Sequence, residues 1–472
     1  MLTFNLPVLD IAAISAQNAH AENEPTPTEV KKFTALRKLY VETYGCQMNL
    51  NDSEIVMGLM RRNGYETTAK PDDADIILLN TCAVRDNAER KIHERLNHLK
   101  YYKKRNRDLV IGILGCMAER LRGDLLDKEL VDMVIGPDEY RSVPDIVKRA
   151  SEGEKGIAVR LSRVETYDDI LPLRAEGISA WVSIMRGCDK FCSFCVVPFT
   201  RGRERSRKLQ SVVDEILHLR DNGFREVTLL GQNVNSYRDE QSGSDFSDLL
   251  VACARSAPDM RLRYSTSHPY DMSDKLIETM TAYDNICKYV HLPAQSGSNR
   301  ILQLMNRNYT AEHYIERVNA IKKAIPECAL STDIIVGFPT ETEDDHRLTL
   351  NLMREVRYDG AYMFNYSPRE NTKSWKMGDD VSQETKSRRL SEIIEMQNAA
   401  SLEKNLAEIG KILEVLVEGA SKRNAAEWQG RSDSNKVVIF AHNENSGYIV
   451  GDYIKVRINR ATSGTLFGDT VK

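Results

Sequence analysis

Three cysteines with close, regular spacing are the residues of this sequence best suited to chemistry. Cys188, Cys192 and Cys195 form a C-x3-C-x2-C run directly after a predicted strand at 181–185. Three thiolates on one loop can hold three corners of an iron–sulfur cubane, which leaves the fourth iron open. A zinc site would need a fourth Cys or His at a usual spacing, and none follows. The pattern therefore favours a [4Fe-4S] cluster whose open iron can chelate an amino-acid-like ligand.

Three further cysteines share a much longer spacing. Cys46, Cys82 and Cys116 are separated by 36 and 34 residues, and each follows a predicted strand (38–44, 75–81 and 109–115). A strand–helix–strand unit takes roughly 30 residues or more, and the ends of parallel strands meet at one sheet edge. This spacing predicts a second cluster with an open iron. Three unrelated buried cysteines are the alternative, since this residue type is often buried.

The elements around these cysteines predict an α/β protein with several domains. Residues 1–37 have the composition of a flexible extension, and 38–165 read as a parallel-sheet α/β domain. Six strand–helix units follow within 175–402, with strands expected at 181–185, 226–230, 261–265, 289–292, 331–336 and 360–364. Six units predict a partial (β/α)6 barrel, because a closed eightfold barrel typically takes about 250 residues. Residues 403–468 predict a small OB-like β-barrel.

The composition of the chain excludes several classes of protein. The 472 residues carry 65 Lys+Arg and 69 Asp+Glu, for a net charge of −4, which excludes a uniformly basic nucleic-acid binder. No apolar run reaches the roughly 18 residues of a membrane span, and no basic secretory start precedes Lys31. We therefore expect a cytoplasmic protein without membrane contact. In that compartment thiols stay reduced, so its nine cysteines favour metal ligation or catalytic roles over disulfides.

The first cysteine set also carries a family resemblance. With aromatic Phe194 before its last cysteine, the loop resembles the signature of the radical S-adenosylmethionine (SAM) enzymes. The resemblance implies that SAM binds the open iron and is cleaved to a 5′-deoxyadenosyl radical, with Phe194 beside its adenine. It also implies SAM contacts by Gln232 and Asn233, and further polar contacts by Gln295 and Asp333. Each of these polar residues could equally be a satisfied group at a strand end.

Over most of its length the chain is similar to the methylthiotransferase family, whose C-terminal module is a TRAM domain. The resemblance rests on the motifs YGCQMN (44–49), NTCAVR (80–85), GQNVN (231–235), LPAQSG (292–297), IVGFP (335–339) and TRGRERSR (200–207). It implies 2-methylthiolation of N6-dimethylallyladenosine at position 37 of the tRNA anticodon loop. One SAM would supply the methyl group and another the radical. It also implies two [4Fe-4S] clusters as cofactors, a flavodoxin- or ferredoxin-type reductant and a monomeric enzyme.

Basic side chains suggest where RNA would bind. Arg201, Arg203, Arg205 and Arg207 follow the cluster loop, where they could contact phosphates. In the β-module, Lys422, Arg423, Arg431 and Trp428 are further candidates, because small β-barrels often hold nucleic acid. A charged surface without a ligand is the alternative.

Two rival functions stay open at this point. One is methylthiolation of another substrate, either threonylcarbamoyladenosine in tRNA or an aspartate of a ribosomal protein. The other is a non-catalytic RNA-binding protein with structural zinc, which would contain no iron and would not cleave SAM.

Overall fold

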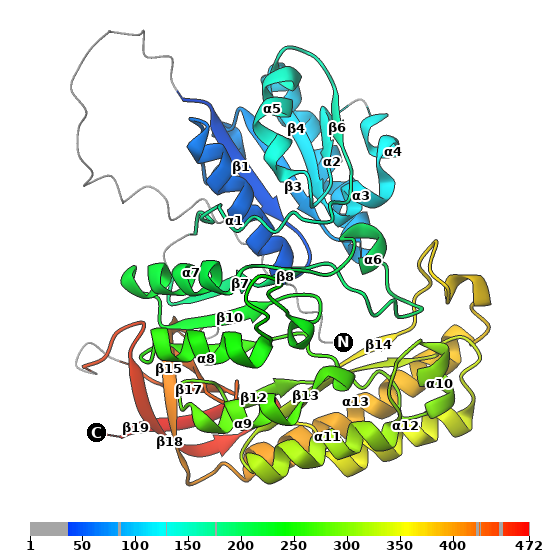
Figure 1. Ribbon diagram of the computed structural model, residues 1–472, viewed down its shortest axis with the longest axis vertical. Helices are drawn as coiled ribbons and strands as arrows, with labels where there is room; N and C mark the ends of the chain where they lie inside the picture. Colours follow the sequence, from blue (N-terminus) through cyan, green and yellow to red (C-terminus); the bar gives the residue numbers. More distant parts are fainter. Residues whose placement is uncertain are drawn as a thin grey trace. The chain divides into compact units, whose positions relative to one another are not determined.

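The computed structural model describes residues 36–83, 86–128, 130–174, 177–421, 424, 426–442 and 447–471, without the side chains of 86–89. It forms two compact units (Figure 1). The first holds residues 36–174 together with Val196–Arg205, and the second holds Gly177–Cys195 and the chain from Ser206 onward. The extension predicted for 1–37 lies outside the described residues, apart from Leu36 and Arg37.

The first unit is built on a six-stranded parallel sheet with the order β2-β1-β3-β4-β5-β6. Its strands are β1 (Lys38–Thr43), β2 (Glu66–Thr67), β3 (Ile76–Thr81), β4 (Val110–Gly115), β5 (Met133–Ile135) and β6 (Gly156–Ala158). Its helices are α1 (Gln47–Arg62), α2 (Asp86–Arg105), α3 (Cys116–Leu121), α4 (Gly123–Leu126) and α5 (Val143–Ser151), with 3-10 turns at Pro71–Asp73 and Tyr140–Ser142. The predicted parallel α/β domain is confirmed.

Helices cover both faces of this sheet, which explains the apolar runs in its central strands. Every residue of β3 and β4 is buried. Ile76 and Leu78 of β3 belong to the apolar cluster that includes residues of α1 and α5, whereas Ile77 and Leu79 belong to the cluster that includes residues of α2 (Figure 1). Alternate side chains of one strand thus enter opposite cores, as in sheets buried on both faces.

The first helix begins earlier than its sequence indicates. Residues 51–63 have the pattern of a helix with Asp52 and Ser53 as start signals, but α1 begins at Gln47 with Cys46 as its N-cap residue. Asp52 and Ser53 lie inside the helix and are fully buried. The Ser53 hydroxyl lies 2.7 Å from that of Thr43, and Asp52 forms an ion pair. Tertiary partners, rather than orphan helix amides, therefore account for these two polar residues.

The second unit contains the predicted open barrel. Its strands form two three-stranded parallel sheets, β11-β10-β7 and β12-β13-β14. Their bounds are β7 (Ser179–Ser183), β10 (Glu226–Leu230), β11 (Arg261–Tyr264), β12 (Tyr289–His291), β13 (Ala329–Val336) and β14 (Gly360–Asn365); β8 (Met185–Arg186) and β9 (Arg205–Ser206) are short. An isolated parallel bridge pairs Leu262 of β11 with Ile286, which precedes β12 in the chain. The six predicted strands are thus all present, in a barrel that does not close.

Helices follow the barrel strands along the chain. They are α6 (Val197–Thr200), α7 (Leu209–Asp221), α8 (Phe246–Ser256), α9 (Asp274–Ala282), α10 (Asn299–Leu304), α11 (Ala311–Ala324), α12 (Glu343–Val356) and α13 (Gln383–Leu406), with 3-10 turns at Val234–Ser236, Pro269–Asp271 and Trp375–Met377. No described helix combines the length and the apolar character that crossing a bilayer requires.

The C-terminal module is a closed barrel with the strand order β15-β16-β17-β19-β18. Its strands are β15 (Ile412–Ala420), β16 (Glu427–Ser432), β17 (Val437–Ala441), β18 (Tyr453–Ala461) and β19 (Leu466–Val471). The sequence did not indicate β19, which closes the barrel by pairing with both β17 and β18. Closure leaves no unpaired edge in this small domain.

Two arginines of β11 attach this module to the open barrel. Arg263 donates to the carbonyls of Ser432 (2.6 Å) and Asp433 (2.7 Å), and its Nε donates to Glu226 (2.8 Å). Arg261 donates to the carbonyls of Arg431 (2.7 Å) and Glu414 (3.0 Å). The buried guanidinium groups therefore satisfy backbone carbonyls where the two parts of this unit meet.

Candidate functional site

The strand register of the first unit brings Cys46, Cys82 and Cys116 to one sheet edge. Thr81 of β3 pairs with Gly115 of β4, so Cys82 and Cys116 are the next residues of neighbouring strands. Thr43 of β1 pairs with Asn80 of β3, and Cys46 follows three residues after Thr43. The predicted convergence of three distant cysteines is present, while their ligand role stays a prediction.

Two glycines allow this close approach. Gly45 has φ 120°, and a Cβ there would lie 2.5 Å from the Cβ of Cys82. Gly115 has φ 90° and ψ −156°, and its Cβ would lie 2.6 Å from the carbonyl oxygen of Thr81. That backbone region is essentially restricted to glycine. Glycine before Cys46 and before Cys116 is therefore part of how the strand ends pack.

A buried arginine contacts one of these cysteines. Nε of Arg201 lies 3.2 Å from Sγ of Cys116, and its Nη2 donates to Oδ1 of Asn49 (3.0 Å) and Oδ2 of Asp52 (2.7 Å). The Cys46 thiol donates to the same Asn49 oxygen at 3.7 Å. Asp52 also accepts from the Tyr140 hydroxyl at 3.2 Å. One guanidinium thus links the surroundings of two cysteines in the set.

The chemistry of these donors fits a cluster. Burial raises the pKa of the Cys116 thiol, and the Arg201 charge opposes that shift by favouring the thiolate. Among the described residues, no three His, Cys, Asp or Glu side chains form a group that could hold one metal ion. A cubane has a different requirement, because each of its thiolates binds a different iron.

In the second unit, the end of α10 and the residues after it support the loop with the other three cysteines. Asn306 Nδ2 donates to the carbonyls of Lys190 (3.2 Å) and Phe191 (2.9 Å), and the Ser193 amide donates to Met305 (2.9 Å). Arg307 Nη1 donates to Sγ of Cys192 at 3.3 Å. Each cysteine set therefore has an arginine in contact with one of its sulfurs, and nothing in the sequence pattern indicates either contact.

Buried polar atoms without partners lie near this loop and at the end of β10. Gln232 Oε1, Asn233 Oδ1 and His268 Nε2 have no hydrogen-bond partner within the described chain. Asn233 Nδ2 donates to Asp271 (2.7 Å), which forms an ion pair with Lys190 (2.7 Å). Buried polar atoms normally find partners. These side chains therefore fit a polar ligand such as the amino-acid part of SAM.

His268 is neutral in this environment. Burial lowers its pKa to about 2, and the charges of Arg307 and Lys190 act in the same direction. Its Nδ1 accepts the Tyr270 amide at 3.3 Å, so Nε2 carries the proton. His268 is thus a neutral hydrogen-bond donor whose Nε2 lacks an acceptor in the described residues.

The other residues predicted to contact SAM, Phe194, Gln295 and Asp333, have different surroundings in the structure. Phe194 is half-buried and packs against the apolar cluster of Ile301, Met305, Phe338 and Tyr366. Gln295 has φ 66°, and its backbone bonds with Asp333 and Ile335. The Asp333 carboxylate lies 3.5 Å from His291. Their SAM contacts stay predictions.

Most of the predicted arginine run does not face solvent. Arg201, Arg205 and Arg207 are 3%, 6% and 6% exposed and form ion pairs with Asp52, Asp138 and Glu215, respectively. The prediction that these three contact RNA phosphates is wrong, because their guanidinium groups are buried against carboxylates. Arg203 is exposed, and its RNA contact stays a prediction.

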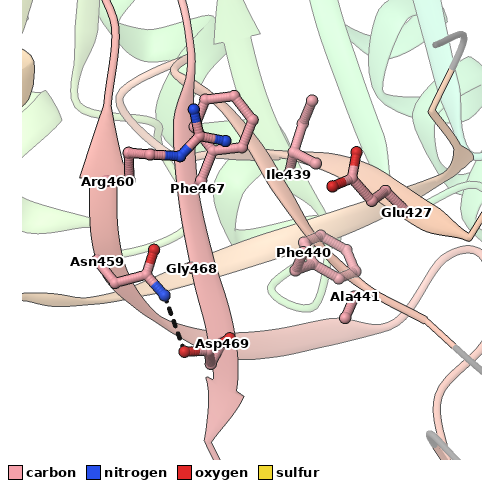
Figure 2. A pocket seen from close by; sticks show the side chains of 9 residues that line it. All are labelled: Glu427, Ile439, Phe440, Ala441, Asn459, Arg460, Phe467, Gly468 and Asp469. Atoms are coloured by element: carbon pink, nitrogen blue, oxygen red, sulfur yellow. Dashed lines mark hydrogen bonds between the residues drawn. The ribbon is translucent and has the colours of Figure 1, made fainter. Parts of the chain in front are cut away.

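The residues of the β-module that were predicted to contact RNA also have different surroundings. Lys422 and Arg423 lie outside the described residues. Arg431 pairs with Glu418 at 2.9 Å, and Trp428 stacks on His442 with ring centroids 3.6 Å apart. A pocket on this barrel is lined by residues that include Arg460 and Phe467, with the guanidinium 3.5 Å from the ring centroid (Figure 2).

Comparison with known proteins identifies the family of this chain. Family models match residues 38–136 (Uncharacterized protein family UPF0004), 182–353 (Radical SAM superfamily) and 406–471 (TRAM domain). The tRNA-2-methylthio-N(6)-dimethylallyladenosine synthase of Parabacteroides distasonis is 52% identical, covering 95% of this chain and 99% of the relative. The enzyme of that name from Porphyromonas gingivalis is 52% identical over 98% and 99%. The chain belongs to this family.

Solved structures agree on the fold. The radical S-adenosylmethionine methyltransferase TsrM of Kitasatospora setae is similar with a TM-score of 0.56 at 15% identity, covering 72% of this chain and 77% of TsrM. As a radical SAM methylthiotransferase, the chain uses SAM and [4Fe-4S] clusters.

Proposed function

We propose that this enzyme adds a methylthio group to C2 of N6-dimethylallyladenosine at position 37 of the tRNA anticodon loop. The observation that carries the proposal is the presence of two separate cysteine triads in a chain of this family. Family membership supports the substrate, since the relatives are named for dimethylallyladenosine in tRNA. Residues 38–165, 175–402 and 403–468 would act as the auxiliary-cluster, radical SAM and TRAM domains.

We propose a division of labour between the cysteine sets. Cys188, Cys192 and Cys195 would hold the SAM-binding cluster, and Cys46, Cys82 and Cys116 the auxiliary one. When bound, these groups supply an electron for SAM cleavage and a site for the transferred sulfur. The protein's own part is to bind and orient: Arg307 donates to the Cys192 sulfur and Arg201 to that of Cys116.

The amino-acid part of SAM would bind at the polar end of β10. Gln232 and Asn233 each offer a buried oxygen without a partner in the described structure, which suits an ammonium group. His268 offers a neutral Nε2–H, which suits a carboxylate oxygen. Phe194, already part of an apolar cluster, would take the adenine ring.

RNA contacts would then come from the β-module instead of the buried arginines. Lys455 and Arg457 of β18 are exposed, whereas Val456 and Ile458 between and after them are buried. The neighbouring Arg460 is also exposed and lies over Phe467 in the pocket of Figure 2. Cations beside an accessible aromatic ring suit phosphates and stacked bases. A flavodoxin- or ferredoxin-type protein would supply electrons, and the enzyme would act as a cytoplasmic monomer.

A pair of cysteine variants tests the division of labour. After anaerobic reconstitution, we expect about eight irons per wild-type chain and about four in either Cys46→Ala or Cys188→Ala. Cys46→Ala should still cleave SAM but form no methylthio product, whereas Cys188→Ala should do neither. Cys253→Ala is the matched control: Cys253 is buried, and burial raises its pKa to about 12, so full iron content is expected. Full product formation by Cys46→Ala would overturn the proposal.

The substrate is tested in cells. Mass spectrometry of tRNA nucleosides from cells lacking the gene should show loss of the methylthio group from dimethylallyladenosine alone. Loss from threonylcarbamoyladenosine, or an unmodified aspartate in a ribosomal protein, would instead support one of the rival substrates.

A further inference from the structure

A buried guanidinium beside the auxiliary cysteines, that of Arg201, forms hydrogen bonds to three side chains. Arg201 is 3% exposed, and it lies six residues after Cys195 within Val196–Arg205, the segment that packs in the first unit. Its Nε donates to Cys116 Sγ (3.2 Å), while Asp52 and Asn49 hold its Nη2. The Asp52 carboxylate is fully buried, so the guanidinium has a fixed position.

One nitrogen of this guanidinium lacks a partner. Nη1 of Arg201 is buried and finds no acceptor among the described residues. A buried cationic donor without an acceptor is unusual in a folded protein, so it points to an acceptor that the chain itself does not supply. The adjacent Cys46 and Cys116, the proposed cluster ligands, indicate the chemistry of that acceptor, which is an anionic sulfur.

We infer that Arg201 is a positioning residue of the auxiliary cluster. It donates to the Cys116 sulfur through Nε and offers Nη1 to a second cluster-associated sulfur. Hydrogen bonds to sulfur and nearby positive charge stabilise the more negative state of a cluster, and they therefore raise its reduction potential. Arg201 thus sets the potential of this cluster and protects its Cys116 corner. The inference rests on the proposed ligation by Cys46, Cys82 and Cys116.

The same segment contains a matched control. Arg205 is 6% exposed and pairs with the buried Asp138 at 2.6 Å, but none of its hydrogen bonds given by the structure reaches a cysteine. Replacing each arginine together with its carboxylate keeps the charge balance and leaves no buried carboxylate unpaired. R201Q/D52N removes the sulfur contact, whereas R205Q/D138N removes a buried ion pair and the contacts of Arg205 to the carbonyls of Glu165, Arg201 and Arg203.

The experiment uses the full chain with Cys188, Cys192 and Cys195 replaced by Ala, so that only the auxiliary cluster remains. We expect this parent to bind about four irons. A redox titration followed by electron paramagnetic resonance should give a more negative midpoint potential in R201Q/D52N and an unchanged one in R205Q/D138N. Iron release to a chelator should be faster in R201Q/D52N alone.

Each of the other outcomes would overturn either the proposed ligation or the role of Arg201. A parent without iron would overturn the proposed ligation, and this inference with it. A loaded parent whose potential is unchanged by R201Q/D52N, or is shifted equally by R205Q/D138N, would overturn the role of Arg201 alone. If R201Q/D52N does not fold, R201K decides, because one ammonium cannot reproduce the forked contacts to Cys116 and Asn49. A potential of R201K equal to the parent's would overturn the inference.

Discussion

Gly115→Ala should destabilise the first unit much more than an ordinary glycine substitution. Gly115 combines φ 90° with ψ −156°, which costs a residue with a side chain about 1–3 kcal/mol. The added Cβ would also lie 2.5 Å from Oδ1 of Asn80 and 2.6 Å from the Thr81 carbonyl oxygen. Thr81 belongs to the central strand β3 and cannot shift without disturbing the sheet, so overpacking adds about 1–3 kcal/mol. The expected total is about 2–6 kcal/mol.

Hydrogen exchange is the suitable assay, because global denaturation of a chain with two units does not report on one of them. All three tryptophans (Trp181, Trp375 and Trp428) lie in the second unit, so fluorescence would miss the change. A loss of 2 kcal/mol speeds exchange through opening about 30-fold, since each 1.4 kcal/mol corresponds to a factor of ten. We expect at least this acceleration in the peptides that cover β3 and β4 of Gly115→Ala.

Gly64→Ala separates backbone strain from steric clash. Gly64 has φ 82°, but a Cβ there would meet nothing within 4 Å. Its substitution should therefore cost only the strain of a left-handed residue, about 1–2 kcal/mol. For equal backbone strain at the two positions, overpacking of at least about 1 kcal/mol makes exchange in β3 and β4 at least about fivefold faster in Gly115→Ala than in Gly64→Ala. Equal rates in the two variants would refute the argument that the strand ends require glycine.

Three further predictions concern other contacts. Burial raises the pKa of Glu119 from 4.5 to about 7, so between these pH values the folded state holds a proton that the unfolded chain releases. The free energy of unfolding therefore falls by up to about 3 kcal/mol as pH rises from 4.5 through 7. Hydrogen exchange of first-unit peptides, corrected for the intrinsic exchange rate and compared at pH 5 and 8, should show no such pH dependence of opening in Glu119→Gln. An unchanged dependence would contradict the prediction. Arg263→Met leaves Glu226 buried without its cation and should cost about 3–5 kcal/mol, partly restored by adding Glu226→Gln. Thermal unfolding followed by tryptophan fluorescence measures this cost, because all three tryptophans lie in the second unit. A stability equal to wild type would count against the ion pair. Arg460→Ala should weaken tRNA binding and lower the salt slope of the binding constant by about 1; filter binding at several salt concentrations tests this, and an unchanged slope would remove Arg460 from the RNA surface.

The sequence by itself determined the framework of this protein. The equal spacing of Cys46, Cys82 and Cys116 placed them after successive parallel strands, because one strand–helix unit has a characteristic length. The close spacing at 188–195 indicated a loop of three thiolates in the same way. Strand β19 was not indicated, since a short segment with Gly468 shows no clear alternation and pairs only once the barrel closes.

Only the tertiary structure decided which charged residues are available. Arg201 and Arg205 look like a solvated basic run, yet their carboxylate partners Asp52 and Asp138 lie 149 and 67 residues away along the chain. Asp52 likewise has the type of a helix start but lies buried inside α1. Local patterns in the sequence indicate the periodicity of a helix or strand and the number of residues between such elements. They do not indicate which charged residue, far away along the chain, pairs with a given side chain. That pairing forms only when folding buries both groups away from water.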